Sequence, residues 1–301
     1  MRVVVSGGAG FIGSHVVEAL VARGDEVHVV DDLSNGRREN VPAQATLHVH
    51  DVREPLDAIA AETAPQALIH LAAQADVRVS VAEPARDAAV NVLGTVNVLE
   101  AARSTGARVV FASTGGAIYG ECERPAREDD PRLPLSPYGT AKLAGEEYLA
   151  MYGRLYGARH VSLRLGNVYG PRQDPHGEAG VVAIFLGRLR DGEVCRIFGD
   201  GRQTRDYVYV GDVVGAVLAA LTADGGVFNV GTGVETSVTD LYEACRRVAG
   251  SDLAPVHETA RPGELGRSVL DPSLAQRVLG FTAATAVADG IARTWEHIRA
   301  S

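Results

Sequence analysis

The N-terminal segment places a glycine-rich turn between an apolar strand and a helix. Residues 2–5 form a short β-rich run, residues 11–23 have a helical pattern, and the turn reads Gly7-Gly8-Ala9-Gly10-Phe11-Ile12-Gly13. Glycines at positions 7, 10 and 13 permit a tight turn, close approach of the backbone to a pyrophosphate, and close packing of helix on strand. The helix N-terminus also attracts an anion. The segment therefore predicts the start of a dinucleotide-binding α/β domain.

Strand-like and helical segments continue to alternate through the first half of the chain. We expect further strands at residues 26–30, 46–50, 67–71, 109–112 and 161–165, and helices at 56–63, 84–105 and 137–156. Such alternation specifies a parallel sheet with right-handed crossovers. The predicted fold class is α/β, a Rossmann-type doubly wound parallel sheet with a smaller C-terminal α/β substrate lobe. Residues 1–166 would form the nucleotide-binding domain, with sheet additions from later segments, and 167–301 mainly the interleaved lobe.

Acidic residues follow the second and third expected strands. Asp31 and Asp32 end the second strand, where a carboxylate can bind ribose hydroxyls and repel a 2′-phosphate. This favours NAD over NADP as the cofactor. Asp51 and Val52 follow the third strand and are placed to meet the adenine, although an Asp at a strand end is more often a helix cap.

The chain has a single lysine among its 29 basic residues, Lys142. It follows Tyr138 by four residues on the expected helix 137–156, so the two side chains share a face. A neighbouring ammonium favours the phenolate and lowers the pKa of a tyrosine, which can then act as a general base. A Tyr-x-x-x-Lys spacing alone is more often a surface pair. In an arginine-rich chain that opens with a nucleotide motif, the lone lysine favours a catalytic pair.

Charge and composition exclude several classes of partner and site. The net charge is −9 with no lysine-rich tail, so we expect no nucleic-acid partner. The three cysteines lie far apart and the histidines lack metal-ligand spacing, so neither a disulfide framework nor a metal site is expected. The first residues indicate a strand rather than a signal peptide, and no apolar run reaches the length of a membrane span. We expect a soluble cytoplasmic protein with no membrane partner.

Several motifs together resemble the extended short-chain dehydrogenase/reductase superfamily over nearly the whole length. They are the glycine turn, the Tyr138/Lys142 pair, His70-Leu71-Ala72-Ala73-Gln74, Asn91, Arg164-Leu165-Gly166-Asn167-Val168-Tyr169-Gly170-Pro171-Arg172 and Arg205-Asp206-Tyr207-Val208. Within the superfamily the chain is most similar to the NAD-dependent epimerase/dehydratase family and its UDP-glucose 4-epimerase group.

The resemblance implies roles for individual residues. Tyr138 would be the catalytic base, Lys142 would hold the nicotinamide ribose, and Thr114, with Ser113 as second choice, would supply the hydroxyl of the third catalytic residue. The cofactor-binding residues would be Gly7, Gly10, Phe11, Ile12, Gly13, Asp31, Asp32, Asn35, Asp51, Val52, Leu71, Ala72, Ala73, Gln74, Asn91, Tyr138 and Lys142. The substrate-binding residues would be Thr114, Tyr138, Asn167, Arg172, Val182, Ile197, Arg205, Arg261, Glu264 and Ser268.

The resemblance also implies a reaction, the NAD-dependent 4-epimerisation of a UDP-hexose through a transient 4-keto sugar. The small Ser268 predicts room for an N-acetyl or otherwise enlarged sugar. A contact between Arg172 and a C6 carboxylate would instead suit a UDP-glucuronate 4-epimerase or decarboxylase. A dTDP-sugar 4,6-dehydratase is disfavoured because Gly115 and Gly116 stand where those enzymes carry an Asp-Glu pair. A non-catalytic NAD-binding protein would typically lack the Tyr/Lys pair.

The resemblance further implies a homodimer, since in the family the helices at 84–105 and 137–156 pair across a two-fold axis. The sequence alone would also allow these helices to pack within one chain.

Overall fold

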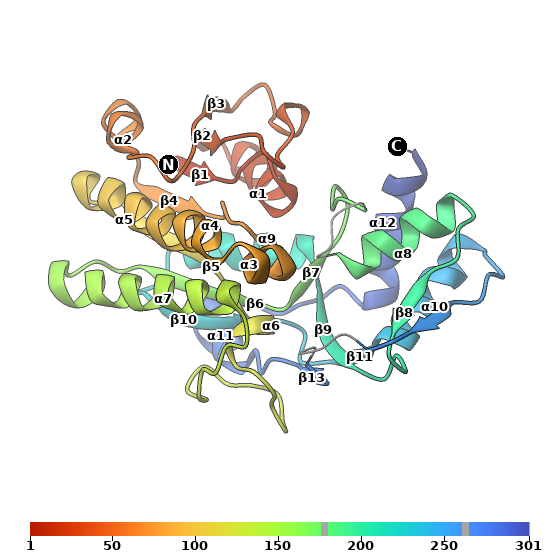
Figure 1. Cartoon of the computed structure of the whole chain (residues 1–301). Helices are drawn as coiled ribbons and strands as arrows, with labels where there is room; N and C mark the ends of the chain where they lie inside the picture. The colour runs from red at the N-terminus through yellow and green to blue at the C-terminus, as the bar shows by residue number, and fades with distance from the viewer. Residues whose placement is uncertain (176–179, 261–264, 301) are drawn as a thin grey trace.

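A seven-stranded parallel sheet forms the larger layer of the computed structural model, which describes residues 1–175, 180–260 and 265–300 (Figure 1). Its order is β10-β6-β5-β4-β1-β2-β3. The strands are β1 (Arg2–Ser6), β2 (Glu26–Asp31), β3 (Thr46–Val49), β4 (Ala67–His70), β5 (Arg108–Thr114), β6 (Val161–Leu165) and β10 (Gly226–Val230). This confirms the predicted doubly wound sheet, in which ligands bind at the carboxyl ends of the strands.

Helices cover both faces of this sheet because its strands are apolar on both sides. Val3 and Val5 point into one core with α1 (Phe11–Ala22), α9 (Val210–Ala220) and α11 (Ser273–Leu279). Val4 points into the other core, which includes side chains from α2 (Asp57–Thr63), α5 (Gly94–Thr105) and α7 (Pro137–Tyr156).

The predicted long helix at residues 84–105 is not uniform. It consists of α4 (Pro84–Ala88), a π-helical turn η2 (Ala89–Leu93) and α5, and it follows α3 (Val77–Ala82). The amphipathic pattern predicts helix throughout but carries no signal for the wider turn. The π turn places the buried Asn91 toward the loop that follows β4. Such turns occur often at functional sites.

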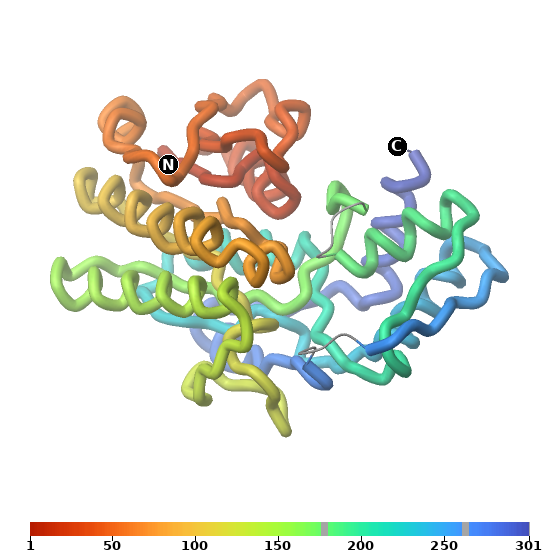
Figure 2. The backbone as a smooth tube through the Cα atoms, in the orientation of Figure 1, coloured from red at the N-terminus to blue at the C-terminus, as the bar shows by residue number. Residues whose placement is uncertain are grey.

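The smaller lobe is built around β9 (Thr204–Tyr209). Its partners are β7 (Asn167–Tyr169), β11 (Glu235–Ser237) and β13 (Arg267–Ser268), and a separate pair joins β8 (Arg196–Phe198) to β12 (Val256–Glu258). Its core lies among α8 (Val181–Arg190), α10 (Val238–Ala249) and α12 (Val287–Ala300). Two short helices lie between strands or helices of the larger layer, η1 (Arg38–Asn40) after β2 and α6 (Gly115–Ile118) after β5. The later half of the chain contributes to both layers, as the green-to-blue path in Figure 2 shows.

Across the described ranges, no helix combines the length and apolarity needed to cross a membrane. Cys122, Cys195 and Cys245 are all free thiols.

Candidate active site

The glycine turn after β1 is closed too tightly for side chains. Gly7 has φ +74°, and a Cβ there would lie 2.6 Å from the amide nitrogen of Ala72. A Cβ on Gly13 would lie 2.0 Å from the carbonyl oxygen of Gly7. Helix α1 begins after Gly10 with no side-chain cap, so its first amides are directed at the turn without a side-chain acceptor. This cradle fits the pyrophosphate of a dinucleotide.

The two carboxylates after β2 differ in their surroundings. Asp31 is buried and accepts hydrogen bonds from the amides of Ala9 (3.0 Å) and Leu33 (2.9 Å), and burial raises the pKa of its carboxyl group. Asp32 is exposed and accepts from Ser34. Asp31 therefore shapes the glycine turn itself. Both stay candidates for the ribose, as does the exposed Asn35 in the next turn.

Asp51 and Val52, which follow β3, also differ in their surroundings. The Asp51 carboxyl group accepts a hydrogen bond from the Arg53 side chain, which lowers the pKa of that carboxyl group. Val52 is buried in the core, and its carbonyl oxygen accepts from the Asn97 side chain at 2.9 Å.

Helix α7 presents Tyr138 and Lys142 on one face, as their spacing predicts. The helix begins at Pro137, and the hydroxyl of Ser136 caps it by accepting from the Gly139 amide at 3.2 Å. The Lys142 ammonium is 5.9 Å from the centroid of the Tyr138 ring. It donates to the Ala112 carbonyl on β5 at 2.9 Å, so the pair is fixed against the sheet.

Burial is the main influence on the acidity of Tyr138. It raises the pKa of Tyr138 to about 12, while the Thr114 hydrogen bond acts in the opposite direction. Burial also lowers the pKa of Lys142 to about 8. The pKa of Tyr138 is thus raised where the spacing to Lys142 predicts a lowered value, because burial disfavours the phenolate and the Asp87 carboxylate repels it.

The two candidate hydroxyls at the end of β5 have different partners. Thr114 forms a side-chain hydrogen bond with Tyr138. Ser113 points to the other side of the strand and donates to Glu146 at 2.5 Å. Glu146 lies one turn after Lys142 and forms a buried ion pair with Arg164 at 2.6 Å. Only Thr114 is thus in contact with the tyrosine.

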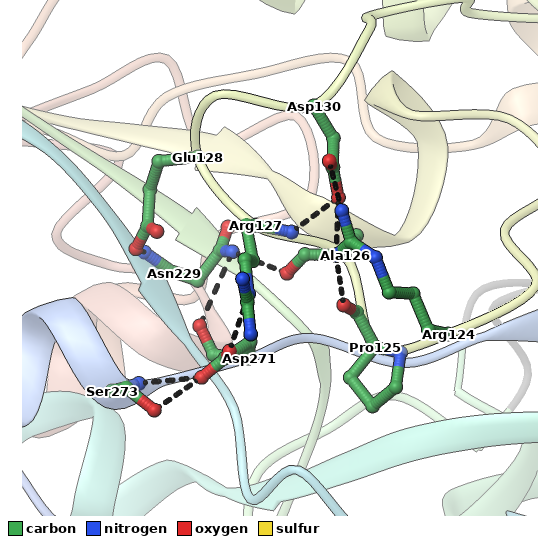
Figure 3. A network of polar contacts seen from close by, with 9 residues as sticks. All are labelled: Arg124, Pro125, Ala126, Arg127, Glu128, Asp130, Asn229, Asp271 and Ser273. Carbon is green, nitrogen blue, oxygen red and sulfur yellow. Dashed lines mark hydrogen bonds and ion pairs between the residues drawn. The ribbon is translucent and has the colours of Figure 1, made fainter.

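The segment at residues 120–136, which leads into α7, is joined to the sheet by hydrogen bonds to β10. Figure 3 shows that the Asn229 side chain on β10 donates to the Ala126 carbonyl at 2.8 Å. Two surface ion pairs flank it, Arg124 with Asp130 and Arg127 with Asp271, and Asp271 accepts from the amide of Ser273. These contacts attach the segment before α7 to β10 and to the residues before α11.

The loop after β4 is held by side chains of the π turn. Asn91 accepts from the Gln74 amide (3.0 Å) and donates to the Gln74 carbonyl (2.9 Å). Leu71, Ala72 and Ala73 precede Gln74 and face the glycine turn through Ala72. The buried Asp87 accepts from both side-chain amides. Our sequence reasoning missed Asp87, because an acid in the first turn of a helix usually serves the helix dipole.

On the substrate side, a cavity of about 430 Å³ opens between β8 and the segment before β13. Its lining includes Phe198, Gly199, Asp200, Arg202, Gln203, Ala260, Leu265 and Gly266. The half-buried Arg205 and the buried Ser268 are paired in register on β9 and β13. The side chains of Val182 and Ile197, predicted to bind substrate, belong to the core of the smaller lobe. Arg261 and Glu264 lie outside the described residues.

Two further predicted substrate residues have clear positions. Asn167 begins β7, and its side-chain oxygen lies 3.4 Å from where a Cβ on Gly116 would be, so these two positions share the space beside Thr114. Arg172 instead pairs with Glu18 on α1 at 2.5 Å and donates to His15 at 2.8 Å. The prediction that Arg172 contacts the sugar is not supported, because its guanidinium is engaged by α1.

The arrangement suits proton transfer beside a bound dinucleotide. Within the described part of the chain, no group of three or more His, Cys, Asp or Glu side chains is placed to hold a metal ion. Among the polar groups at the carboxyl edge of the sheet, Thr114, Tyr138 and Lys142 supply a hydroxyl, a phenol and an ammonium, a set that can move a proton to or from a substrate hydroxyl.

Comparison with known proteins gives a consistent result. A family model described as the NAD dependent epimerase/dehydratase family matches residues 3–231. A UDP-glucose 4-epimerase of Mycolicibacterium smegmatis is 48% identical, with 99% of each chain covered. The crystal structure of a Thermotoga maritima UDP-glucose 4-epimerase with UDP-glucose has a TM-score of 0.98 and 45% identity, covering 100% of this chain and 99% of that one. A Thermus thermophilus UDP-glucose 4-epimerase in complex with NAD has a TM-score of 0.95 and 48% identity, covering 99% of each.

Proposed function

The chain belongs to the NAD dependent epimerase/dehydratase family, and from this we propose that it is a UDP-hexose 4-epimerase that interconverts UDP-glucose and UDP-galactose with bound NAD. The observation that carries the proposal is the contact of Thr114 and Lys142 with Tyr138 at the carboxyl edge of the sheet. The full-length similarity to UDP-glucose 4-epimerases supports the choice of sugar.

The glycine turn between β1 and α1 would hold NAD, which would supply reversible hydride transfer at C4 of the sugar. Tyr138 accepts the proton of the 4-hydroxyl and later gives it back. Thr114 forms a hydrogen bond with the phenol oxygen. The Lys142 ammonium lies 5.9 Å from the centroid of the Tyr138 ring, and a positive charge near a phenolate favours it. Tyr138 can accept this proton only as the phenolate, and burial raises the pKa of Tyr138 to about 12, so the phenol must first give up its own proton to solvent.

The remaining substrate roles stay proposals. We assign the UDP to the cavity beside Phe198 and Gly199, with Arg205 close to the diphosphate. Asn167, Arg261 and Glu264 are assigned to the nucleotide-sugar on the family resemblance.

A UDP-glucuronate 4-epimerase or decarboxylase would be indicated by a contact between Arg172 and the C6 carboxylate. In the structure Arg172 instead forms an ion pair with Glu18, so Arg172 gives no support to that function. A 4,6-dehydratase is also unsupported, since the positions after Thr114 are Gly115 and Gly116 and offer no carboxylate for the elimination of water.

The test is product analysis by NMR. The purified protein is incubated, without added NAD, with UDP-glucose, UDP-N-acetylglucosamine and UDP-glucuronate in separate reactions. We expect a mixture of UDP-glucose and UDP-galactose, and loss of activity by a factor of about 10² or more in Tyr138→Phe because the general base is gone. Release of CO2 from the glucuronate, or no product from any of the three, would refute the proposal.

We also infer a homodimer formed through α7 and the helical segment from α3 to α5. These elements lie side by side at the front of Figure 1 and pack together. They leave several large apolar side chains exposed, including Val81, Leu93, Leu155 and Tyr156. Such a surface is more typical of an interface than of a solvated face. Sedimentation equilibrium should give the mass of two chains, and a single-chain mass at micromolar concentration would contradict the inference.

A further inference from the structure

Asp87 is a buried acid beside the catalytic pair. It lies on α4, one turn before Asn91, and is 1% exposed. Its Oδ1 atom accepts from Gln74 Nε2 at 3.0 Å and from Asn91 Nδ2 at 2.9 Å. Its Oδ2 atom is buried, and no hydrogen-bond partner for it exists among the described residues. A buried carboxylate oxygen without a donor is costly, so its charge calls for a physical explanation.

The first part of the explanation is that the Asp87 carboxylate helps to hold the loop at residues 72–76 in place. The Gln74 side chain also donates to the Asp76 carbonyl and accepts from the Asp76 amide. Asp87 thereby ties the loop at residues 72–76 to the π turn through a single oxygen atom. This loop abuts the glycine turn at Ala72.

The second part is the charge of Lys142. The lysine is 2% exposed, so the ammonium has lost most of its hydration. The charged and titratable groups that face it are Asp87, Glu146, His70 and Tyr138. Glu146 is held by Arg164 in a buried ion pair. Asp87 has no ion pair in the described structure, and it is the largest favourable charge acting on the ammonium.

We propose that Asp87 is a positioning residue that keeps Lys142 protonated in its buried site and fixes the Gln74–Asn91 contact next to the cofactor cradle. This role rests on the proposed 4-epimerase function, in which Lys142 acts as a cation. Within the described residues Asp87 forms no hydrogen bond or ion pair with either reacting group, so it acts through the loop and through its charge, which favours the protonated form of Lys142 and raises the pKa of Tyr138.

The single lysine makes the proposal directly measurable. In protein labelled with [13Cε]lysine, one side-chain signal reports the protonation of Lys142. Its pKa should be about 8 in the parent chain. In Asp87→Asn, which keeps the shape and the Oδ1 acceptor but removes the charge, we expect a decrease of about one unit. The matched control is Asp57→Asn, an exposed acid on α2, which should leave the signal unchanged.

Asp87→Glu restores the charge and should return the titration toward that of the parent. An unchanged titration in a folded Asp87→Asn protein would overturn the proposal. A pKa decrease of one unit should reduce turnover about fivefold at pH 8 but hardly at pH 6, whereas a purely structural defect would reduce it equally at both. If no UDP-sugar reacts but the titration still shifts, the proposed function fails while the charge role of Asp87 stands.

Discussion

Two consecutive glutamates on α7 allow a direct comparison of a buried and an exposed ion pair. Glu146 pairs with Arg164, and the two side chains are 2% and 1% exposed. Glu147 pairs with Arg132, and these side chains are 54% and 41% exposed. A glutamine at either position removes one charge and keeps the shape. The two variants therefore differ mainly in the surroundings of the arginine that is left behind.

We expect very different costs. The Glu146→Gln substitution would leave the Arg164 Nε and one terminal nitrogen without their carboxylate, although the other terminal nitrogen keeps Tyr119 and the Glu128 carbonyl. Leaving one charge of a buried pair uncompensated costs about 3–5 kcal/mol. An exposed pair contributes about 0–1 kcal/mol. With an unfolding entropy of about 0.6 kcal/mol per kelvin for 301 residues, Tm should fall by about 5–8 °C in Glu146→Gln and by less than about 2 °C in Glu147→Gln.

The assay is thermal unfolding followed by circular dichroism, at equal protein concentration, with urea unfolding as a second measure. A double variant, Glu146→Gln with Arg164→Met, should recover part of the loss because no unpaired charge remains in the core. Equal midpoints for the two single variants would refute the reasoning, since burial would then have no effect on the value of the pair.

Three further predictions concern the active site and its surroundings. Thr114→Val should reduce kcat by a factor of about 10 or more with little change in Tm, whereas Ser113→Ala should cost about 1 kcal/mol of stability and keep activity. Steady-state kinetics and melting curves measure the two effects. The reverse pattern would make Ser113 the catalytic hydroxyl. Ser268→Tyr should lower turnover of UDP-N-acetylglucosamine relative to UDP-glucose, because a ring at this buried position fills space on the substrate side, and an unchanged ratio of the two rates would count against that role. His70 is buried between Ser6 and Thr95, and burial lowers its pKa to about 3, below the value near 6.5 in the unfolded chain. The unfolded chain therefore binds the proton first, and stability is lost as the pH falls from about 6.5 toward 3, by up to about 1.4 kcal/mol per pH unit. Urea unfolding at several pH values should show a shallower dependence of stability on acid pH in His70→Gln, and an identical dependence would contradict this assignment.

Local signals explain why much of the fold is predictable. The helix α7 begins and ends where the sequence predicts, because Pro137 suits the first helical turn and Gly157 adopts φ +71° at its end. The strands from β1 to β6 are apolar runs bounded by turns, and each lies within two residues of its predicted bounds at either end.

The errors come from contacts between distant residues. The partner of Arg172 is Glu18, 154 positions away, and no local pattern indicates it. The pKa of Tyr138 depends on how deeply the phenol is buried, which spacing along a helix does not reveal. The π turn arises where Asn91 reaches the Gln74 backbone, and it leaves the helical pattern of the sequence unchanged.

Strand β10 gives the sheet its last edge and also sets an order for biosynthesis. A ribosome delivers the glycine turn, Tyr138 and Lys142 long before residues 226–230, which pair with β6. Until then the nascent chain carries an open, apolar edge at Val161–Leu165, the kind of edge that favours aggregation. Ala275 and Phe281, which belong to the same core, follow later still. A fragment truncated after the first six strands would therefore hold the catalytic residues and still lack a completed sheet to support them.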